Sequence, residues 1–120
     1  MKTLWMAAIA AAGMSLPMAA SACGYTYCHG AVGAGQNGEW AYSVNQWSEQ
    51  DAINNVYAQC NGRCDVVKTF VNTCASIARG SNGAWGFDTE WNTELAASSA
   101  MNWCMDYGYN CCPVVSVCSQ

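Results

Sequence analysis

A pattern that occurs twice, roughly 45 residues apart, constrains this chain more than any other feature. Both copies share an Asn-Gly-x-Trp tetrapeptide, a second Trp, an Ala and a Cys, and the spacing from the second Trp to the Cys is the same in both. The copies run from Asn37 through Trp40, Trp47 and Ala52 to Cys60, and from Asn82 through Trp85, Trp91 and Ala96 to Cys104. The segments that precede the two copies also match in sequence, with Cys28–Val32 aligned to Cys74–Ala78. Two copies are too few for a solenoid, so we expect one domain with pseudo-repeats at about 28–73 and 74–118.

The first 22 residues have the pattern of a secretory signal peptide. Lys2 gives a positive start, Leu4–Leu16 is apolar, and Ala20-Ser21-Ala22 is a small-residue cleavage site. We therefore predict a mature domain over 23–120, located in the periplasm or secreted. Cleavage would leave Cys23 first in the mature chain, so a lipid anchor through Cys23 is the alternative. We expect no transmembrane segment, because no later apolar run approaches the length of a membrane span.

All nine cysteines follow residue 22, which in a small secreted chain predicts a disulfide framework. We expect Cys60–Cys64, Cys104 with Cys111 or Cys112, and Cys74 with Cys118 between neighbouring strands. Cys23 or Cys28 would take the remaining thiol of the Cys111-Cys112 pair. A zinc site is disfavoured, because the chain has one His and lacks paired Cys-x-x-Cys motifs. We expect no metal and no cofactor.

The charge of the chain limits its partners. Residues 23–120 carry three basic and eight acidic side chains, which gives a net charge of −5 with His29 neutral. Nucleic acid and anionic membrane surfaces are therefore excluded as partners. A protein partner or a neutral glycan is compatible with this charge.

Hydrophobic periodicity and turn residues predict strands at 30–35, 39–44, 84–88 and 113–118, and a long strand over 65–79 that bends near Asn72. Ser48 and Asn92 are the predicted helix N-caps, and Asn61-Gly62 and Gly108 the ends. This order predicts an α+β, disulfide-rich fold. We expect a mostly antiparallel sheet with two helices on one face and a two-fold strand-strand-helix pseudo-repeat. The smaller side chains of the second helix predict that it packs closer to the sheet.

Three features together resemble a known family. They are the two Asn-Gly-x-Trp hairpins, the junctions from Trp to helix, and the Cys-x-Val-Val strands that begin at Cys64 and Cys112. In these the chain from Cys28 to Cys118 is similar to a bacterial secreted domain family of unknown function, number four-one-eight-nine. The resemblance implies a cysteine-stapled α+β domain behind a signal peptide, and it implies no catalytic residue. The chain departs from the family pattern in Cys111-Cys112 and in the segment from Cys23 to Cys28.

Catalytic patterns are weak. Cys28 and His29 are adjacent in a predicted strand and so point to opposite faces. Five acidic residues could supply a catalytic pair, but we interpret each as a charge that stabilises a helix N-terminus or as a solvated loop charge. They are Glu39, Glu49, Asp51, Glu90 and Glu94. We therefore expect a protein that is not an enzyme.

Aromatic residues are the main functional signal. Trp40, Trp47, Trp85 and Trp91 repeat, so we interpret them as packing residues. Aromatic and amide residues without a repeat equivalent are the predicted binding residues, because Tyr and Trp dominate interface hot spots. They are Tyr25, Tyr27, Trp103, Tyr107, Tyr109 and Asn110. The chain is thus predicted to be a non-enzymatic secreted or periplasmic binding module, in its most specific version an inhibitor or immunity protein against a delivered toxin. A cell-wall glycan-binding module and a small cell-wall hydrolase are the alternatives.

Overall fold

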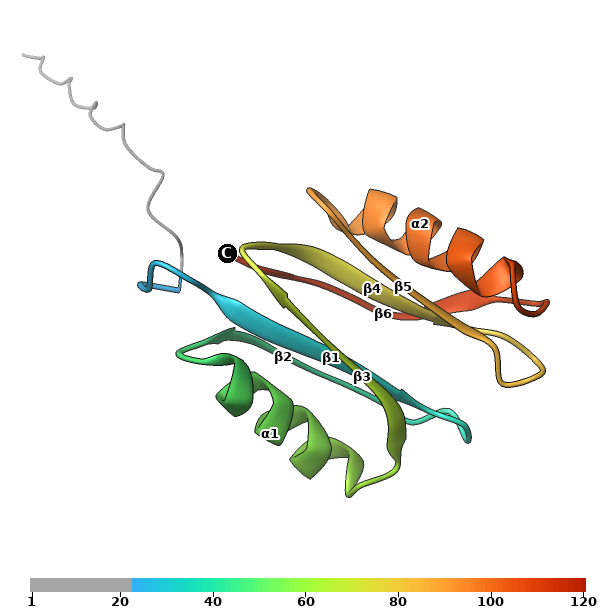
Figure 1. The fold of residues 1–120 in the computed structure, drawn as a ribbon, viewed down its shortest axis with the longest axis horizontal. Helices are drawn as coiled ribbons and strands as arrows, with labels where there is room; N and C mark the ends of the chain where they lie inside the picture. Colours follow the sequence, from blue (N-terminus) through green and yellow to red (C-terminus); the bar gives the residue numbers. More distant parts are fainter. Residues whose placement is uncertain (1–22) are drawn as a thin grey trace, which may run out of the picture.

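The computed structural model describes residues 23–120, so the predicted signal peptide lies outside the described residues. Two units follow each other along the chain, each with the order strand, strand, helix, strand (Figure 1). The first unit contains β1 (His29–Gly35), β2 (Trp40–Gln46), α1 (Glu49–Cys60) and β3 (Cys64–Val71). The second contains β4 (Thr73–Arg79), β5 (Trp85–Glu90), α2 (Thr93–Met105) and β6 (Cys112–Ser119).

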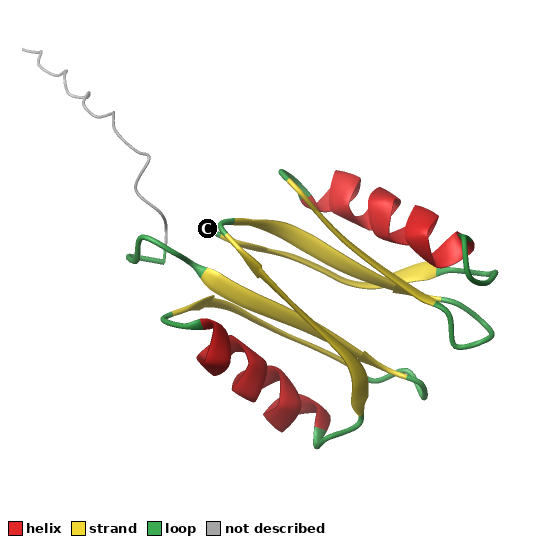
Figure 2. Ribbon diagram, viewed as in Figure 1, coloured by secondary structure: helices red, strands yellow, loops and turns green. Residues whose placement is uncertain are grey.

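Each unit forms its own antiparallel sheet, with strand orders β2-β1-β3 and β5-β4-β6. The two sheets face each other, and α1 and α2 cover the two outer faces (Figure 2). The prediction of an α+β, disulfide-rich fold with antiparallel strands is confirmed. The prediction of two helices on one face is wrong, because the molecule has four layers, helix, sheet, sheet and helix. The physical reason is that each sheet has an apolar inner face as well as an apolar face beneath its helix.

The core between the sheets contains residues of both units. It is built from Val32, Ala34, Val66 and Phe70 of the first sheet and Ala75, Ile77 and Val115 of the second. Side chains alternate along a strand, so the neighbours of these residues point outward. Ala31 joins the cluster beneath α1, and Ala78 joins the cluster beneath α2.

The same alternation corrects the alignment of the two copies. The bonds that close the two hairpins are equivalent, Gly35 N–H to Glu39 O and Gly80 N–H to Ala84 O, both at 2.8 Å. Counted back from them, Val32 matches Ile77, and both face the other sheet. The pairing of Cys28–Val32 with Cys74–Ala78 was therefore one residue out of register. A slip of one residue exchanges the two faces of a strand.

The chain crosses from one sheet to the other at Asn72, where the sequence predicts a bend. Asn72 has a left-handed backbone with φ 56°, which ends β3 before β4 begins. It also bonds twice to Cys28, since its Oδ1 accepts the Cys28 N–H at 2.8 Å and its own N–H donates to the Cys28 carbonyl at 3.2 Å. The predicted long strand is thus two strands that belong to different sheets.

The helix ends lie where the capping residues predict them. The Ser48 hydroxyl accepts the Asp51 N–H at 3.1 Å, and the Asn92 side chain accepts the Leu95 N–H at 2.8 Å. Asn61 ends α1 with φ 52°. Gly108 lies beyond α2, and its N–H donates to the Cys104 carbonyl in the last turn of the helix. These bonds satisfy backbone groups that have no partner inside a helix.

Four disulfides staple the described residues. They are Cys23–Cys28, Cys60–Cys64, Cys74–Cys118 and Cys104–Cys111. Both helix ends are thus bridged to the chain just before or at the next strand, as the repeat predicts. One expectation is wrong, because neither Cys23 nor Cys28 bonds to the remaining thiol of the Cys111-Cys112 pair. Cys23 and Cys28 bond to each other, and Cys112 is a free, exposed thiol. In the chain-entropy description, Cys74–Cys118, with a separation of 44, contributes most, about 4 kcal/mol against about 2 kcal/mol for Cys60–Cys64.

Helix α2 lies directly on strand β5, as the small side chains of its buried face predict. A Cβ added at Gly86 would meet backbone atoms of α2, namely the Ala100 carbonyl oxygen and the Cys104 nitrogen. In the first unit, a Cβ at Gly33 would meet the Val56 side chain at 2.6 Å. The helix backbone therefore rests on the strand only in the second unit.

We expect Gly86→Ala to destabilise the protein by more than about 2 kcal/mol, because the helix backbone must move to admit a methyl group. Gly33→Ala is the matched control and is expected to cost less, since a side chain can shift instead. Urea unfolding with the disulfides intact measures both free energies. Equal costs for the two variants would contradict the close contact.

An ion pair joins the two sheets near the hairpin ends. The Arg79 Nη2 donates to the Asp65 Oδ2 at 3.1 Å, and Gln36 donates to the same oxygen at 3.3 Å. Desolvation raises the pKa of Asp65, but the hydrogen bonds from Arg79 and Gln36 and the Arg79 charge outweigh it and lower the pKa. Within residues 23–120, the buried Nε and Nη1 of Arg79 have no hydrogen-bond partner, so Asp65 is the main partner of this guanidinium.

A lowered pKa means that ionised Asp65 stabilises the fold above the ordinary aspartate pKa of about 3.9, and that this contribution is lost as the pH falls through the folded-state value. We expect Asp65→Asn to lower the unfolding free energy by about 1 kcal/mol at pH 7, allowing for solvent screening of the half-exposed carboxylate. The gap between variant and wild type should shrink at pH 3. Denaturant unfolding at both pH values measures it, and a gap that widens in acid would contradict the pair.

Candidate binding groove

A concave surface with aromatic walls runs along β5, one of the two outer strands of the second sheet. It has a volume of about 590 Å³. Its side chains come from three elements, from the hairpin before β5 and from the loop after α2. They are Lys68 of β3, Trp85 and Phe87 of β5, Trp103 of α2, and Asn82 and Tyr107 from the segments beside them.

Strand β5 places the groove between two walls. Trp85 and Phe87 alternate with Gly86, so their rings point toward the first sheet while Gly86 lies beneath α2. On the helix side, the Trp103 indole N–H donates to the Asp88 carboxylate at 3.1 Å. The other Asp88 oxygen accepts the Thr89 N–H at 2.8 Å. Trp103 is therefore fixed at the rim of the groove by a hydrogen bond.

Lys68 supplies the positive charge of the groove. Its ammonium lies 5.1 Å from the centroid of the Trp85 ring, a cation–π contact between the two units. Within residues 23–120, no carboxylate lies within ion-pair distance of Lys68, whereas Arg79 is paired with Asp65. The groove is thus a local cationic and aromatic site on an acidic protein.

The structure divides the predicted binding residues into separate sites. Trp103 and Tyr107 line the groove. Tyr109 and Asn110 lie in the loop between α2 and β6, where the Tyr109 carbonyl accepts the Ser81 N–H at 2.9 Å and Asn110 makes a left-handed turn. They are next to the groove and are not among its lining residues.

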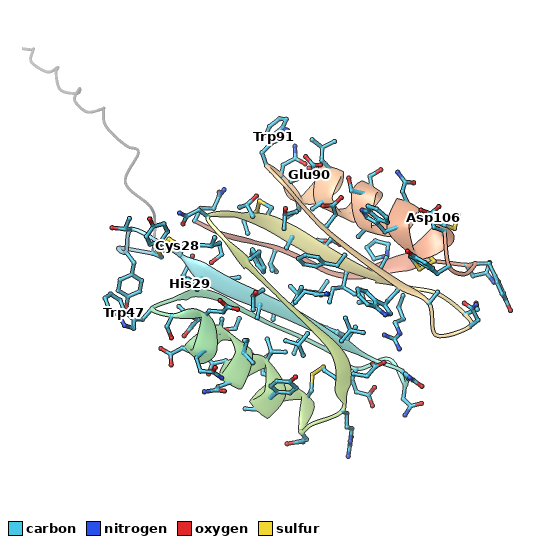
Figure 3. The ribbon with its side chains drawn as sticks, in the orientation of Figure 1. Cys28, His29, Trp47, Glu90, Trp91 and Asp106 are labelled. Carbon is cyan, nitrogen blue, oxygen red and sulfur yellow. A yellow bond between two sulfur atoms is a disulfide. The ribbon has the colours of Figure 1, made fainter. Side chains whose placement is uncertain are left out.

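Tyr25 and Tyr27 lie at the opposite end of the molecule. They line a second hollow of about 470 Å³ together with Trp47, whose ring contacts Tyr25 edge-on at 5.1 Å between centroids. Figure 3 shows Trp47 and Cys28 at one end and Asp106, at the end of α2, at the other. The predicted aromatic set therefore does not form one surface.

Sequence patterns do not identify three of the groove residues. The repeat predicts a packing role for Trp85, and no motif marks Lys68 or Phe87. A usable signal was the charge of Lys68 on the apolar face of its strand, since Val66 and Phe70 two residues away on either side are buried between the sheets. A charged side chain among apolar ones marks a place where a face is open to solvent or to a ligand.

The interpretation of the repeated Trp residues as packing residues is correct only for Trp85. Trp40, Trp47 and Trp91 are 54%, 69% and 75% exposed. Figure 3 shows Trp91 projecting beyond β5 next to Glu90. Trp47 and Trp91 lie just before the helix N-caps, outside the buried layers. Trp40 and Trp85 both begin an outer strand, but only Trp85 packs against the core between the sheets and beneath Lys68.

The candidate catalytic groups have other roles in the structure. Cys28 is oxidised in the disulfide with Cys23, so no thiol stands beside His29. The Glu39 carboxylate accepts the Asn37 N–H at 3.0 Å inside its own hairpin, and the Glu49 carboxylate accepts the Thr69 hydroxyl at 3.3 Å. In the part of the chain that the structure describes, no cluster of His, Cys, Asp and Glu is suited to hold a metal ion.

The fold and the groove define a small α+β domain of four layers, stapled by disulfides and carrying an aromatic groove with one cation. A family model described as a domain of unknown function, DUF4189, matches residues 18–118. The chain belongs to this family, as its hairpin and cysteine motifs predict. Comparisons with curated proteins and with solved structures find no significant match. Over residues 23–120, neither helix is long and apolar enough to cross a bilayer.

The disulfide pattern leads to a prediction about the expected lipid anchor at Cys23. The sulfur of Cys23 is bonded to Cys28, so it is not available for the thioether that a lipid anchor requires. We expect the intact mass to show no acyl chain, and alkylation without reductant to label Cys112 alone. Cys112→Ser is the control and should take up no label. An acylated Cys23, or a label on Cys28, would contradict the pairing.

Proposed function

We propose that this protein is a secreted or periplasmic binding module without catalytic activity, and that the groove along β5 is its ligand site. The observation that carries the proposal is the lining of the groove, where Trp85, Trp103 and Tyr107 share one surface with Lys68, whose ammonium has no carboxylate within ion-pair distance among residues 23–120. Four disulfides are compatible with an oxidising compartment. The dispersed roles of Cys28, Glu39 and Glu49 support a role other than catalysis.

A protein is the partner that the groove favours, and an inhibitor or immunity protein is the specific version of this role. Aromatic side chains held in a rigid frame are the usual anchors of protein interfaces. A preformed site loses little conformational entropy on binding, because its walls are already ordered. Here the ordering comes from the Trp103–Asp88 hydrogen bond and from Cys104–Cys111 at the end of the same helix.

A cell-wall glycan is the second candidate, and a different surface favours it. Trp40 and Tyr42 on β2 are both exposed, with ring planes only 3° apart and centroids 6.5 Å apart. Parallel exposed rings are a suitable platform for the apolar faces of sugars. This surface belongs to the first unit and is distinct from the groove.

The two candidates are separated by capture on the immobilised protein. If a protein partner uses the groove, Tyr107→Ala and Lys68→Met should each reduce the protein retained from a periplasmic extract by at least about tenfold, the loss typical of a hot-spot residue. Trp47→Ala is the matched control, because it removes an exposed aromatic at the other end. Retention of purified cell-wall sacculi that depends on Trp40, with no groove-dependent protein, would contradict the proposal.

A further inference from the structure

The floor of the groove is an unpaired strand edge. In an antiparallel ladder, hydrogen-bonded residue pairs alternate with pairs that do not bond to each other. The bond from Gly80 N–H to Ala84 O fixes this alternation for β4 and β5. Together with the register Ala78↔Gly86 and Ile77↔Phe87, this bond makes Ala78 and Gly86 a hydrogen-bonded pair, and Ile77 and Phe87 a pair without mutual hydrogen bonds. The backbone N–H and C=O of Phe87 therefore point away from the sheet, toward the groove.

The equivalent edge of the first unit is closed by a side chain. The hairpin bond from Gly35 N–H to Glu39 O and the register Val32↔Tyr42 turn the backbone groups of Tyr42 outward in the same way. There the Gln59 amide of α1 binds both groups. It accepts the Tyr42 N–H at 3.3 Å and donates to the Tyr42 carbonyl at 2.7 Å. Gln59 thus occupies the place of a neighbouring strand.

The second unit lacks this closure. The residue before the repeated Cys in the last turn of each helix is Gln59 in the first unit and Trp103 in the second. Trp103 has a single donor and no acceptor, and its N–H is bound to Asp88. Within residues 23–120, no side chain bonds to the outward backbone groups of Phe87, and β5 has no second neighbouring strand. Unpaired edges of this kind are usually blocked in natural proteins.

We propose that the open edge of β5 binds an extended peptide segment of the partner protein as an added β-strand. This inference rests on the proposed function, whose groove it uses. The peptide pairs with the N–H and C=O of Phe87, which gives affinity independent of sequence. Its side chains alternate between two walls. One set contacts Trp103 and Tyr107, and the opposite set faces Lys68 and Trp85, where an acidic residue is favoured.

The outward backbone N–H and C=O of Phe87 favour a peptide over a glycan or a second copy of this chain. A glycan has no regular row of amide donors and acceptors that matches a strand edge. A second copy of this chain would bring its own Lys68 to the same edge, and both copies carry net negative charge. A single extended segment with an acidic residue pairs with the edge and also neutralises Lys68.

The experiment uses the oxidised protein and a phage-displayed library of linear peptides as the probe. Selected peptides are synthesised, and binding is followed by fluorescence titration and by amide hydrogen exchange. We expect peptides with an acidic residue and apolar residues at alternate positions. We expect the Phe87 amide to exchange at least about tenfold more slowly in the complex, since it becomes hydrogen-bonded.

Two substitutions at one position separate strand pairing from simple wall contact. Trp103→Gln introduces the closing residue of the first unit and should weaken peptide binding at least about tenfold. Trp103→Leu keeps an apolar wall that cannot pair with the strand and should weaken binding much less. Tyr42, closed by Gln59, is the internal reference, and its amide should show no change on peptide binding.

The outcomes distinguish this inference from the proposed function. Peptides that bind through Tyr107 and Lys68 without slowing the Phe87 amide would leave the groove as the site and overturn strand addition. Equal losses for Trp103→Gln and Trp103→Leu would also overturn it. A concentration-dependent dimer that protects Phe87 without peptide would replace the peptide by a second copy. Both proposals would be contradicted if no peptide is selected and if the protein captured from the periplasmic extract is unaffected by substitutions in the groove.

Discussion

The apolar contact between the two sheets is the constraint on which the rest of the structure depends. Each unit covers one face of its sheet with a helix and leaves the other face bare. Val32 and Phe70 of one unit meet Ile77 and Val115 of the other, which buries both bare faces. Burying a large aliphatic or aromatic side chain contributes roughly 1.5–3 kcal/mol each. The clusters inside the two units, beneath α1 and α2, consist mainly of Ala and Cys, so most of the larger apolar side chains are buried only where the units meet.

The disulfides add to this packing without replacing it. Cys74–Cys118 joins the central and outer strands of the second sheet, while the other three bridges close short local loops. The two units are linked across the layers by hydrogen bonds instead. The Ser119 hydroxyl donates to the Cys28 carbonyl at 2.8 Å and accepts the Asn45 N–H at 2.9 Å. The end of the chain therefore depends on the first unit for its partners.

The proposed binding function depends on the differences between two similar halves. Both units place an outer strand beside a helix, but Gln59 closes one edge and Trp103 leaves the other open. The close approach of α2 over Gly86 brings Trp103 to the rim of the groove. Lys68 comes from the other unit. A single unit would thus lack one wall of the site, which gives a reason for two copies in one chain.

Local chemistry alone determined much of the fold. The Asn-Gly turns, the Ser48 and Asn92 caps, the break at Asn72 and the short Cys60–Cys64 bridge all depend on residues close in sequence, so the sequence predicts them. The four-layer arrangement and the groove depend on contacts between distant residues. The Cys23–Cys28 bridge is local, but the sequence offered Cys111 and Cys112 as alternative partners for either thiol. Sequence patterns show that a strand has two apolar faces, but they do not show what covers each face. Only the tertiary structure decided that Lys68, Trp85 and Trp103 meet, because three elements of two units must pack before these side chains share one surface.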